Sequence, residues 1–155
     1  MFDIIMDEVT YRIAQAADVE NVFKFEFKRQ CKDEVEEIEN QIMVWNSYFR
    51  KEALEHYFKT GWSFLATDSK QEIKGFFMAQ PLLFVEKQTQ SLWVEYVSAV
   101  SDEIYTELVD IAYRLAREKH FQKVLFSDHV TQNKLIKNFD FKVWERNVFY
   151  LKTTK

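Results

Sequence analysis

Only two of the 155 residues are glycine, and both Gly61 and Gly75 lie in the first half of the chain. Typical glycine usage of roughly 7% would give about eleven. Glycine allows positive φ angles, tight turns and close approach of the backbone to a ligand, and loops that wrap a phosphate in main-chain N–H groups usually depend on it. The second half of this chain must therefore make its turns, and any ligand-binding loop, without glycine.

The composition is typical of one globular domain. A chain of 155 residues is long enough for one hydrophobic core and short for two. Aromatic residues make up 17% of the sequence and charged residues 30%, which supplies a core and argues against disorder. We therefore expect a single domain over residues 1–155.

Charge, hydropathy and cysteine content exclude several partner classes. The net charge is −4, without a long basic run, which argues against nucleic acid as an obligatory partner. No stretch approaches the roughly 20 apolar residues of a membrane span, and the acidic amino terminus is unlike a signal peptide. Cys31 is the single cysteine, so no internal disulfide forms. We expect a cytoplasmic protein without a membrane or nucleic-acid partner.

Helical and strand patterns alternate along the whole chain. Apolar spacings of three and four predict helices over residues 19–27, 35–58, 101–116 and 131–138. Short apolar or alternating runs predict strands over residues 10–15, 62–67, 72–80, 91–97, 123–126 and 141–152. Pro81 should end or bend its strand because proline cannot donate to a ladder. The order β-α-α-β-β-β-α-β-α-β predicts an α/β fold with a mixed sheet and helices on both faces.

One predicted helix carries an apolar stripe at intervals of three and four. Its members are Val35, Ile38, Ile42, Trp45 and Phe49. The repeat is short, which favours a helix packed on its own domain over a coiled coil. A homodimer formed through the stripe stays open.

Four strings occur in an order and spacing that carry a family resemblance. Residues 10–22 are TYRIAQAADVENV, residues 62–77 are WSFLATDSKQEIKGFF, residues 107–126 form a helix and strand pattern, and residues 135–141 are LIKNFDF. In this order they resemble the GNAT superfamily of acyl-CoA-dependent N-acyltransferases over nearly the whole chain. The resemblance implies a GNAT-like fold, acetyl-CoA or another acyl-CoA as cofactor, and a small-molecule or peptide amine as acceptor.

The phosphate loop departs from the family pattern. GNAT enzymes hold the CoA pyrophosphate with R/Q-x-x-G-x-G/A, whereas residues 97–106 contain no glycine, arginine or glutamine. Asp102 and Glu103 suit the first turn of a helix. Each would oppose a bound pyrophosphate by on the order of 0.5–2 kcal/mol at an effective dielectric of 20–80. The missing glycines matter more, because side chains block close approach. We expect a degenerate phosphate loop.

The resemblance also implies a general acid that this chain lacks. Many GNAT members place a tyrosine where it protonates the departing CoA thiolate, and the spacing to Phe141 puts Ile136 at that position. Isoleucine cannot transfer a proton. Whether another group takes over this role stays open.

Glu95 is the candidate general base for deprotonating an amine. It lies in the strand where several GNAT members carry a catalytic glutamate. Strand alternation predicts that Glu95 shares a face with Trp93 and Val97, with Tyr96 on the opposite face. The alternative is a glutamate on a wet or edge face of the sheet.

The resemblance places acyl-CoA contacts along the same strand and in a later loop. His129 falls near a family asparagine that contacts the pantetheine arm, although helix capping explains a polar residue there equally well. The expected cofactor-binding residues are Tyr96, Val97, Ser98, Ser101, His129 and Asn133. The three histidines have no metal-ligand spacing with one another or with Cys31, so no metal site is expected.

Three functions therefore stay open. The first is an N-acyltransferase with Glu95 as base and an unusual phosphate loop. The second is a GNAT-like binding or regulatory module that no longer binds CoA. The third is a dimerisation or scaffold protein, suggested by the aromatic content and the apolar stripe.

Overall fold

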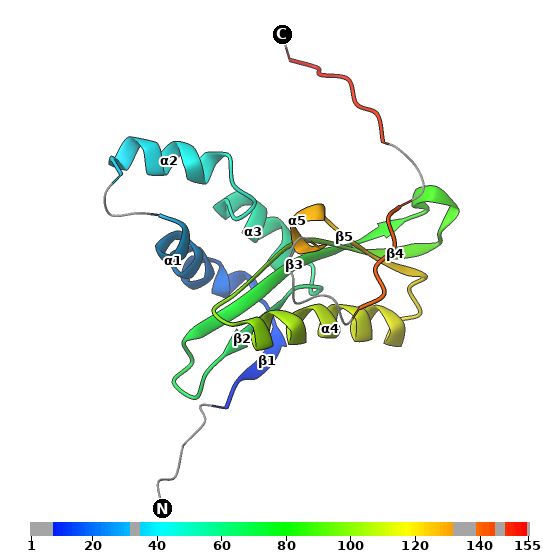
Figure 1. Cartoon of the computed structure of the whole chain (residues 1–155), viewed down its shortest axis with the longest axis horizontal. Helices are drawn as coiled ribbons and strands as arrows, with labels where there is room; N and C mark the ends of the chain where they lie inside the picture. Colours follow the sequence, from blue (N-terminus) through cyan, green and yellow to red (C-terminus); the bar gives the residue numbers. More distant parts are fainter. Residues whose placement is uncertain (1–7, 32–34, 132–138, 145–147, 155) are drawn as a thin grey trace, which may run out of the picture.

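A five-stranded mixed sheet organises the described part of the chain, in the spatial order β1-β2-β3-β4-β5 (Figure 1). The computed structural model describes residues 8–31, 35–131, 139–144 and 148–154. The strands are β1 Thr10–Ile13, β2 Phe64–Thr67, β3 Ile73–Leu83, β4 Gln90–Ala99 and β5 Lys123–Phe126. Neighbours from β1 to β4 are antiparallel, whereas β4 and β5 are parallel. The predicted single α/β domain with a mixed sheet is confirmed.

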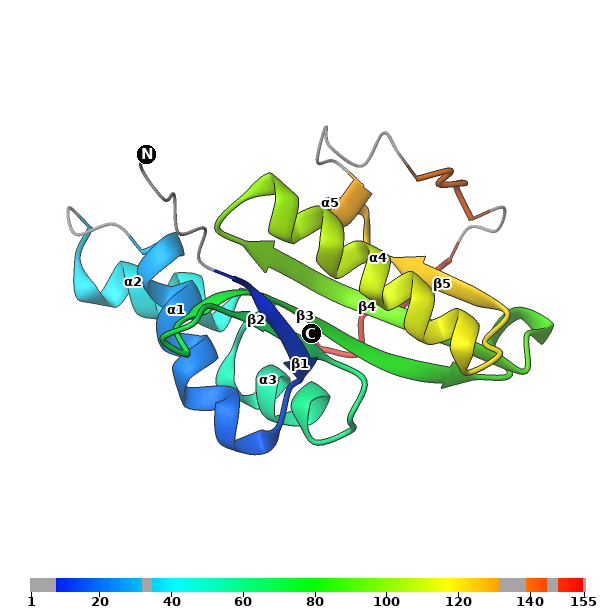
Figure 2. The same cartoon turned by 90° about the horizontal axis from the view of Figure 1, so that it is seen from below.

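Helices cover both faces of this sheet, as Figure 2 shows. The helices are α1 Val19–Gln30, α2 Glu37–Trp45, α3 Lys51–Phe58, α4 Asp102–Glu118 and α5 Asp128–Thr131, with short 3-10 turns at Ala16–Asp18 and Val85–Lys87. α1 and α3 lie on one face and α4 on the other (Figure 2). α4 links β4 to β5, because a parallel pair needs a crossover connection.

The core has one layer on each side of the sheet. On the α4 side, Leu108 and Ala112 are fully buried against Phe77 and Leu92. On the other side, the helices α1 and α3 pack on the sheet through a second cluster that includes Val22, Leu54, Phe58, Leu65, Phe76 and Met78. Full burial of each large apolar side chain contributes about 1.5–3 kcal/mol. The predicted face of residues 101–116 is the one that α4 buries. In α1, Val19 and Val22 of the predicted face are buried, whereas Phe23 and Phe27 are partly exposed.

Gly75 is the glycine that the packing requires. It pairs with Ala99 of β4, and a Cβ at Gly75 would lie 2.8 Å from the Ser98 carbonyl oxygen and 3.0 Å from Leu108 Cδ1. Gly61 follows α3 with a φ of +81°, a conformation that favours glycine. Beyond Gly75 the chain turns without glycine. His120, for example, follows α4 with a φ of +60°.

The apolar stripe of residues 35–49 does not pack as expected. The helical stretch predicted over residues 35–58 is two helices, because α2 ends at Trp45 and α3 begins at Lys51. Ile38, Ile42 and Trp45 are 66%, 57% and 64% exposed, whereas Phe49 is 2% exposed. The prediction that this stripe packs on its own domain is therefore wrong for α2. The chain turns after Trp45, and α3 rather than α2 lies on the sheet (Figure 1).

Pro81 does not end its strand. β3 continues to Leu83, with Pro81 paired to Leu92. β2 reaches only as far as Phe77 on the other edge of β3. Beyond Phe77, β3 therefore needs ladder hydrogen bonds along one edge only, and a residue without an N–H donor is tolerated there.

The strand predicted over residues 141–152 is absent from the parts of that range that the structure describes. Residues 141–144 and 148–152 have no ladder partner, and Phe149 and Leu151 are 89% and 92% exposed. Alternating apolar residues make a strand only where a neighbouring edge pairs with them. The helix predicted over residues 131–138 lies outside the described residues, apart from Thr131 at the end of α5.

Candidate functional site

β4 parts from β5 halfway along its length. The parallel ladder runs from Ser91 paired with Lys123 to Val94 paired with Phe126. The Ser127 N–H then donates to the Val94 carbonyl oxygen at 3.2 Å, and the chain turns into α5. β4 continues without β5 to Ala99. Residues 95–99 therefore have no paired strand on this edge among the described residues, and α5 lies beside this half of β4 (Figure 1).

A β-bulge marks the point where the strands part. Tyr96 pairs with Met78 and Val94 pairs with Ala79, so Glu95 is an extra residue in β4. The bulge changes the predicted alternation. Val97 is buried in the core on the α4 side, whereas Tyr96 packs against the core on the α1 and α3 side. Tyr96 and Val97 therefore lie on opposite faces, as predicted. The predicted sharing of one face by Glu95 and Val97 is wrong, because the Glu95 charge acts on Tyr57 of α3, on the face opposite Val97.

Glu95 lies half-buried beside Trp93, as alternation predicted for that pair. The Trp93 indole N–H donates to Glu95 Oε2 at 2.5 Å. Burial, with a smaller contribution from the negative charge of Glu95, raises the pKa of Tyr57 to about 12. Since Tyr57 belongs to α3, the carboxylate lies on the α3 side of the sheet, at the end of the β4–β5 ladder.

Tyr96 and Ser98 are both bound to a buried carboxylate that sequence reasoning missed. Glu26 of α1 is fully buried and accepts hydrogen bonds from Tyr96 Oη at 2.6 Å, Ser98 Oγ at 2.7 Å and Gln30 Nε2 at 2.9 Å. Arg29 Nε lies 3.5 Å from Glu26 Oε2. Burial, followed by the charge of Glu26, raises the pKa of Tyr96 well above its usual range.

The two hydroxyls therefore donate inside the protein, and neither O–H is directed to a ligand. Helical spacing held a signal for Glu26, because Val19, Val22 and Glu26 follow one another at intervals of three and four and are the buried residues of α1. Its partners on β4 are 70 and 72 residues away in the chain. No local pattern reveals such a contact.

Three rings gather at the open edge of β4. His129 of α5 lies 5.0 Å from the Tyr96 ring and 5.1 Å from the Tyr48 ring, centroid to centroid. Tyr48 and Tyr96 stack at 5.6 Å. Tyr48 comes from the turn between α2 and α3. The helical layer and α5 therefore meet over the open half of β4.

His129 is hydrogen-bonded through both ring nitrogens. Nδ1 lies 2.6 Å from Ser127 Oγ, and the same hydroxyl donates to the Glu95 carbonyl oxygen at 2.7 Å. The Val97 N–H donates to Nε2 at 3.4 Å. Burial lowers the pKa of His129, against smaller opposite effects of Asp128 and Glu95. The imidazole is therefore neutral at pH 7, beside both Glu95 and Val97.

Ser101 lies apart from this cluster, at the start of α4. Its Oγ accepts the Ile104 N–H at 3.3 Å, so Ser101 is the N-cap. Only Val100 and Ser101 separate β4 from α4, and Asp102 and Glu103 occupy the first helical turn. Of the remaining predicted positions, Asn133 and Ile136 lie outside the described residues.

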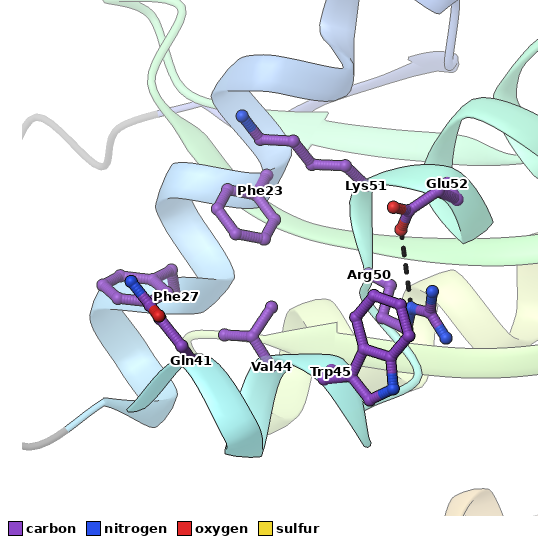
Figure 3. Close-up of a pocket in the computed structure, with 8 residues that line it drawn as sticks. All are labelled: Phe23, Phe27, Gln41, Val44, Trp45, Arg50, Lys51 and Glu52. Atoms are coloured by element: carbon purple, nitrogen blue, oxygen red, sulfur yellow. Dashed lines mark ion pairs between the residues drawn. The ribbon is translucent and has the colours of Figure 1, made fainter. Parts of the chain in front are cut away.

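A separate cavity of about 240 Å³ lies between α1, α2 and α3 (Figure 3). Its lining residues are Phe23, Phe27, Gln41, Val44, Trp45, Arg50, Lys51 and Glu52. The Arg50 guanidinium lies 4.0 Å from the Trp45 ring centroid and pairs with Glu52 at 3.4 Å. Neither Glu95 nor His129 lines this cavity. Both cationic side chains of this cavity are paired within the protein, Arg50 with Glu52 and Lys51 with Glu20 at 3.0 Å.

Two kinds of site are not found in the part of the chain that the structure describes. There, no three His, Cys, Asp or Glu side chains are grouped so that they could hold a metal ion. Likewise, none of its helices is long and apolar enough to cross a lipid bilayer.

No family model matches the chain, and comparison with curated proteins finds no match. Solved structures do match over nearly the whole length. A probable acetyltransferase superposes with a TM-score of 0.66 at 15% identity, covering 96% of this chain and 99% of the other. A predicted acetyltransferase with acetyl-CoA from Clostridium acetobutylicum gives a TM-score of 0.65 at 15% identity, covering 93% of this chain and 96% of the other.

The aminoglycoside N-acetyltransferase AAC(6')-Iy, in complex with CoA, gives a TM-score of 0.64 at 13% identity and covers 99% of this chain and 100% of its own. A structure described as a transcriptional regulator from Bacillus halodurans also matches, with a TM-score of 0.58 at 16% identity, over 94% of this chain and 100% of the other. The chain therefore has the GNAT fold, which the order and spacing of the four sequence strings predicted. Identities this low show the fold alone.

Proposed function

We propose that this protein is an N-acyltransferase that transfers an acyl group from acyl-CoA to an amine, with Glu95 as the general base. The observation that carries the proposal is the position of Glu95. It is the extra residue of the bulge at which β4 parts from β5. The main-chain groups of Glu95 and Val97 at the open strand edge bind Ser127 and His129, and the Glu95 carboxylate lies close enough to raise the pKa of His129 against the effect of burial. Two matched structures of this fold contain acetyl-CoA or CoA.

Two groups of the open half of β4 have different roles in the proposed reaction, one as a base and one as a hydrogen-bond donor. Glu95 takes a proton from the substrate ammonium, which frees the nitrogen lone pair for attack on the thioester carbonyl. A positioned base of this kind contributes about 10²–10⁴-fold to the rate. The Val97 N–H donates to the carbonyl oxygen as negative charge develops there. Loss of one such donor costs about 10²–10³-fold in other enzymes.

The residues fit the thioester end of acyl-CoA better than its pyrophosphate end. At the thioester end, the Val97 N–H has only a long 3.4 Å bond to His129, which a ligand carbonyl can replace. At the other end, Ser101 Oγ already takes the Ile104 N–H, and Asp102 and Glu103 stand in the first turn of α4. The degenerate phosphate loop proposed from the sequence therefore predicts weak binding of the nucleotide part.

That same helix start favours a second candidate, a GNAT-fold binding or regulatory module that does not bind CoA. An N-cap serine and two acidic side chains in the first turn already stabilise the N-terminus of α4, so no bound anion is needed there. The two candidates differ in one measurable property, which is the affinity for CoA.

Thermal-shift titration with acetyl-CoA and with free CoA separates the two candidates. Under the first, millimolar ligand raises the melting temperature, since any ligand that binds only the folded state stabilises it. The absence of a shift at millimolar ligand would refute the acyltransferase proposal and support the module.

Glu95→Gln tests the assignment of the base. The substitution keeps an acceptor for the Trp93 indole and removes the base, so we expect unchanged CoA binding and a kcat lowered by about 10²–10³-fold. Glu118→Gln removes the same charge from the exposed end of α4 and serves as the matched control. Unchanged turnover in Glu95→Gln would remove Glu95 from the mechanism.

The exposed stripe on α2 supports a homodimer as an additional proposal. Ile38, Ile42 and Trp45 present apolar side chains to solvent on one helix, and such patches often mark protein contacts. Analytical ultracentrifugation tests it. Sedimentation as a monomer at high micromolar concentration would exclude the dimer. A dimer whose sedimentation is unchanged in Ile42→Glu would show that the stripe is not its interface.

A further inference from the structure

The hydrogen bonds around His129 determine where its proton lies. The Glu95 carbonyl oxygen can only accept, so the single Ser127 hydroxyl proton is donated to it. Nδ1 of His129, 2.6 Å from that hydroxyl, must then carry its own proton and donate to Ser127 Oγ. On the other side, the Val97 N–H can only donate, so Nε2 must be bare. Both constraints agree on one neutral tautomer, with the proton on Nδ1.

This tautomer directs a basic nitrogen at the site of the proposed reaction. Nε2 lies 3.4 Å from the Val97 nitrogen, and that N–H is the donor assigned above to the thioester carbonyl. An oxygen that replaces Nε2 on this N–H lies beside the imidazole. The neighbouring carbon, nitrogen and sulfur of the reacting group are then within reach of one proton acceptor.

The groups around His129 favour its charged form once a proton arrives. On β4, Glu95 is negative and raises the pKa of the imidazole, as does Asp128 on α5. Tyr48 and Tyr96 each present a ring about 5 Å from the imidazole centroid, and a cation near an aromatic face is stabilised. Behind Tyr96, the buried Glu26 accepts the hydrogen bond of the phenol and so holds the ring in place. Burial opposes these effects, so the imidazolium is a transient species.

We infer that His129 is a catalytic residue that carries a proton from the attacking amine to the departing thiolate. The inference rests on the proposed function and assigns the general acid left open by Ile136. Glu95 first removes one proton from the substrate ammonium and releases it to solvent. The amine then attacks, the C–N bond forms, and the carbonyl π electrons move to oxygen.

His129 alone transfers the remaining proton. Nε2 takes the proton from the nitrogen of the tetrahedral intermediate and becomes an imidazolium. The carbonyl re-forms, the C–S bond breaks, and the electron pair leaves on sulfur. The Nε2 proton then passes to that thiolate. The products are the amide and the free thiol, His129 is neutral again, and no further reactant is needed.

The inference can be tested without knowing the acceptor amine, by nitrogen-15 NMR of the three histidines. Comparison with His129→Gln assigns the His129 signals. We expect the Nδ1-protonated tautomer in the free protein. We also expect the nitrogen-15 signal of the bare Nε2 to differ between the CoA complex and the desulfo-CoA complex, because only CoA has an S–H group that can donate to it.

The possible results separate this inference from the function on which it rests. Binding of both ligands with the same Nε2 signal would overturn the role of His129 and leave the acyltransferase proposal standing. An Nε2-protonated tautomer would also overturn it. If neither CoA nor desulfo-CoA raises the melting temperature, the proposed function fails and the inference fails with it.

Turnover of His129→Gln provides a second test. Glutamine can still accept the Val97 N–H and donate to Ser127, but it cannot carry a proton. With acetyl-CoA and hydroxylamine as the amine, we expect kcat to fall by about 10²–10⁴-fold. With the acetyl thioester of 4-nitrothiophenol, whose thiolate leaves without protonation, the loss should be at least tenfold smaller. Equal losses with both thioesters would show a purely structural role.

Discussion

The two halves of β4 differ in almost every physical property. Its first half, up to Val94, is paired on both edges, and Leu92 and Val94 are fully buried between β3, β5 and α4. Its second half, from Glu95, is paired on one edge only and carries Tyr96 and Ser98 as well as the glutamate. The bulge lies between them. One strand therefore combines a stable apolar segment with a polar segment that is directly attached to it.

The polar half is stable because other elements supply its hydrogen-bond partners. Glu26 of α1 accepts from two of its hydroxyls, and Ser127 and His129 bind main-chain groups of Glu95 and Val97. Among the described residues, no buried side-chain nitrogen or oxygen lacks a partner. Polar groups at the edge of a core cost little when each is satisfied. A site for chemistry can thus adjoin the core without weakening it.

The largest expected effect falls on the apolar half. Leu92→Ala removes a fully buried side chain between two strands and α4, and should lower the free energy of unfolding by about 3–4 kcal/mol. Urea denaturation measures this loss. Leu83→Ala, at a 58% exposed position of β3, is the control and should change stability by less than about 0.5 kcal/mol. Equal losses would contradict the difference in burial.

A smaller loss is expected from the polar half. Glu26→Leu leaves the Tyr96 and Ser98 hydroxyls buried without their acceptor, at a cost of about 2–3 kcal/mol in the free energy of unfolding. Adding Tyr96→Phe and Ser98→Ala to that variant removes both unsatisfied donors and should restore part of the stability. A triple variant no more stable than Glu26→Leu in urea would show that these hydrogen bonds are not the cause.

The smallest expected effect is a pH dependence of stability. Burial lowers the pKa of folded His129 below the 6.5 of an unfolded histidine. The unfolded chain then binds more protons below about pH 6.5, so this contribution to stability is present above that pH and is lost as the pH falls toward the folded pKa. Urea denaturation at pH 7.5 and 5.5 should show a loss in the wild type that is smaller in His129→Gln. A larger loss in the variant would contradict it.

Local patterns were sufficient for the sheet and for the helices that lie on it. The order of the strands up to β5, the buried face of α4 and the place of Glu95 beside Trp93 all follow from the spacing of apolar residues. Patterns failed where the outcome depends on distant partners. The stripe on α2 has the apolar spacing of a buried helix face, yet the turn after Trp45 leaves three of its residues exposed.

The site could be predicted as a region but not as a set of contacts. Of the predicted residues, the structure brings Glu95, Tyr96, Val97 and His129 together, whereas Ser98 points to Glu26 and Ser101 caps α4. Strict alternation misplaced Glu95 relative to Tyr96 and Val97, since a bulge adds a residue without changing the apolar pattern on either side. Glu26 and Tyr48 reach the site from other elements, through contacts that follow only from the tertiary fold.

The bulge at Glu95 also determines which genetic changes this region tolerates. Val94 and Tyr96 already pair with neighbouring residues of β3, so deleting Glu95 would restore regular pleating and leave the other side chains of β4 on their present sides of the sheet. Deleting Val97 instead would bring the Ser98 hydroxyl into the apolar layer under α4. An alignment of distant homologues that opens a gap at Glu95 would therefore still match residues from the same side of the sheet, whereas a gap at Val97 would not.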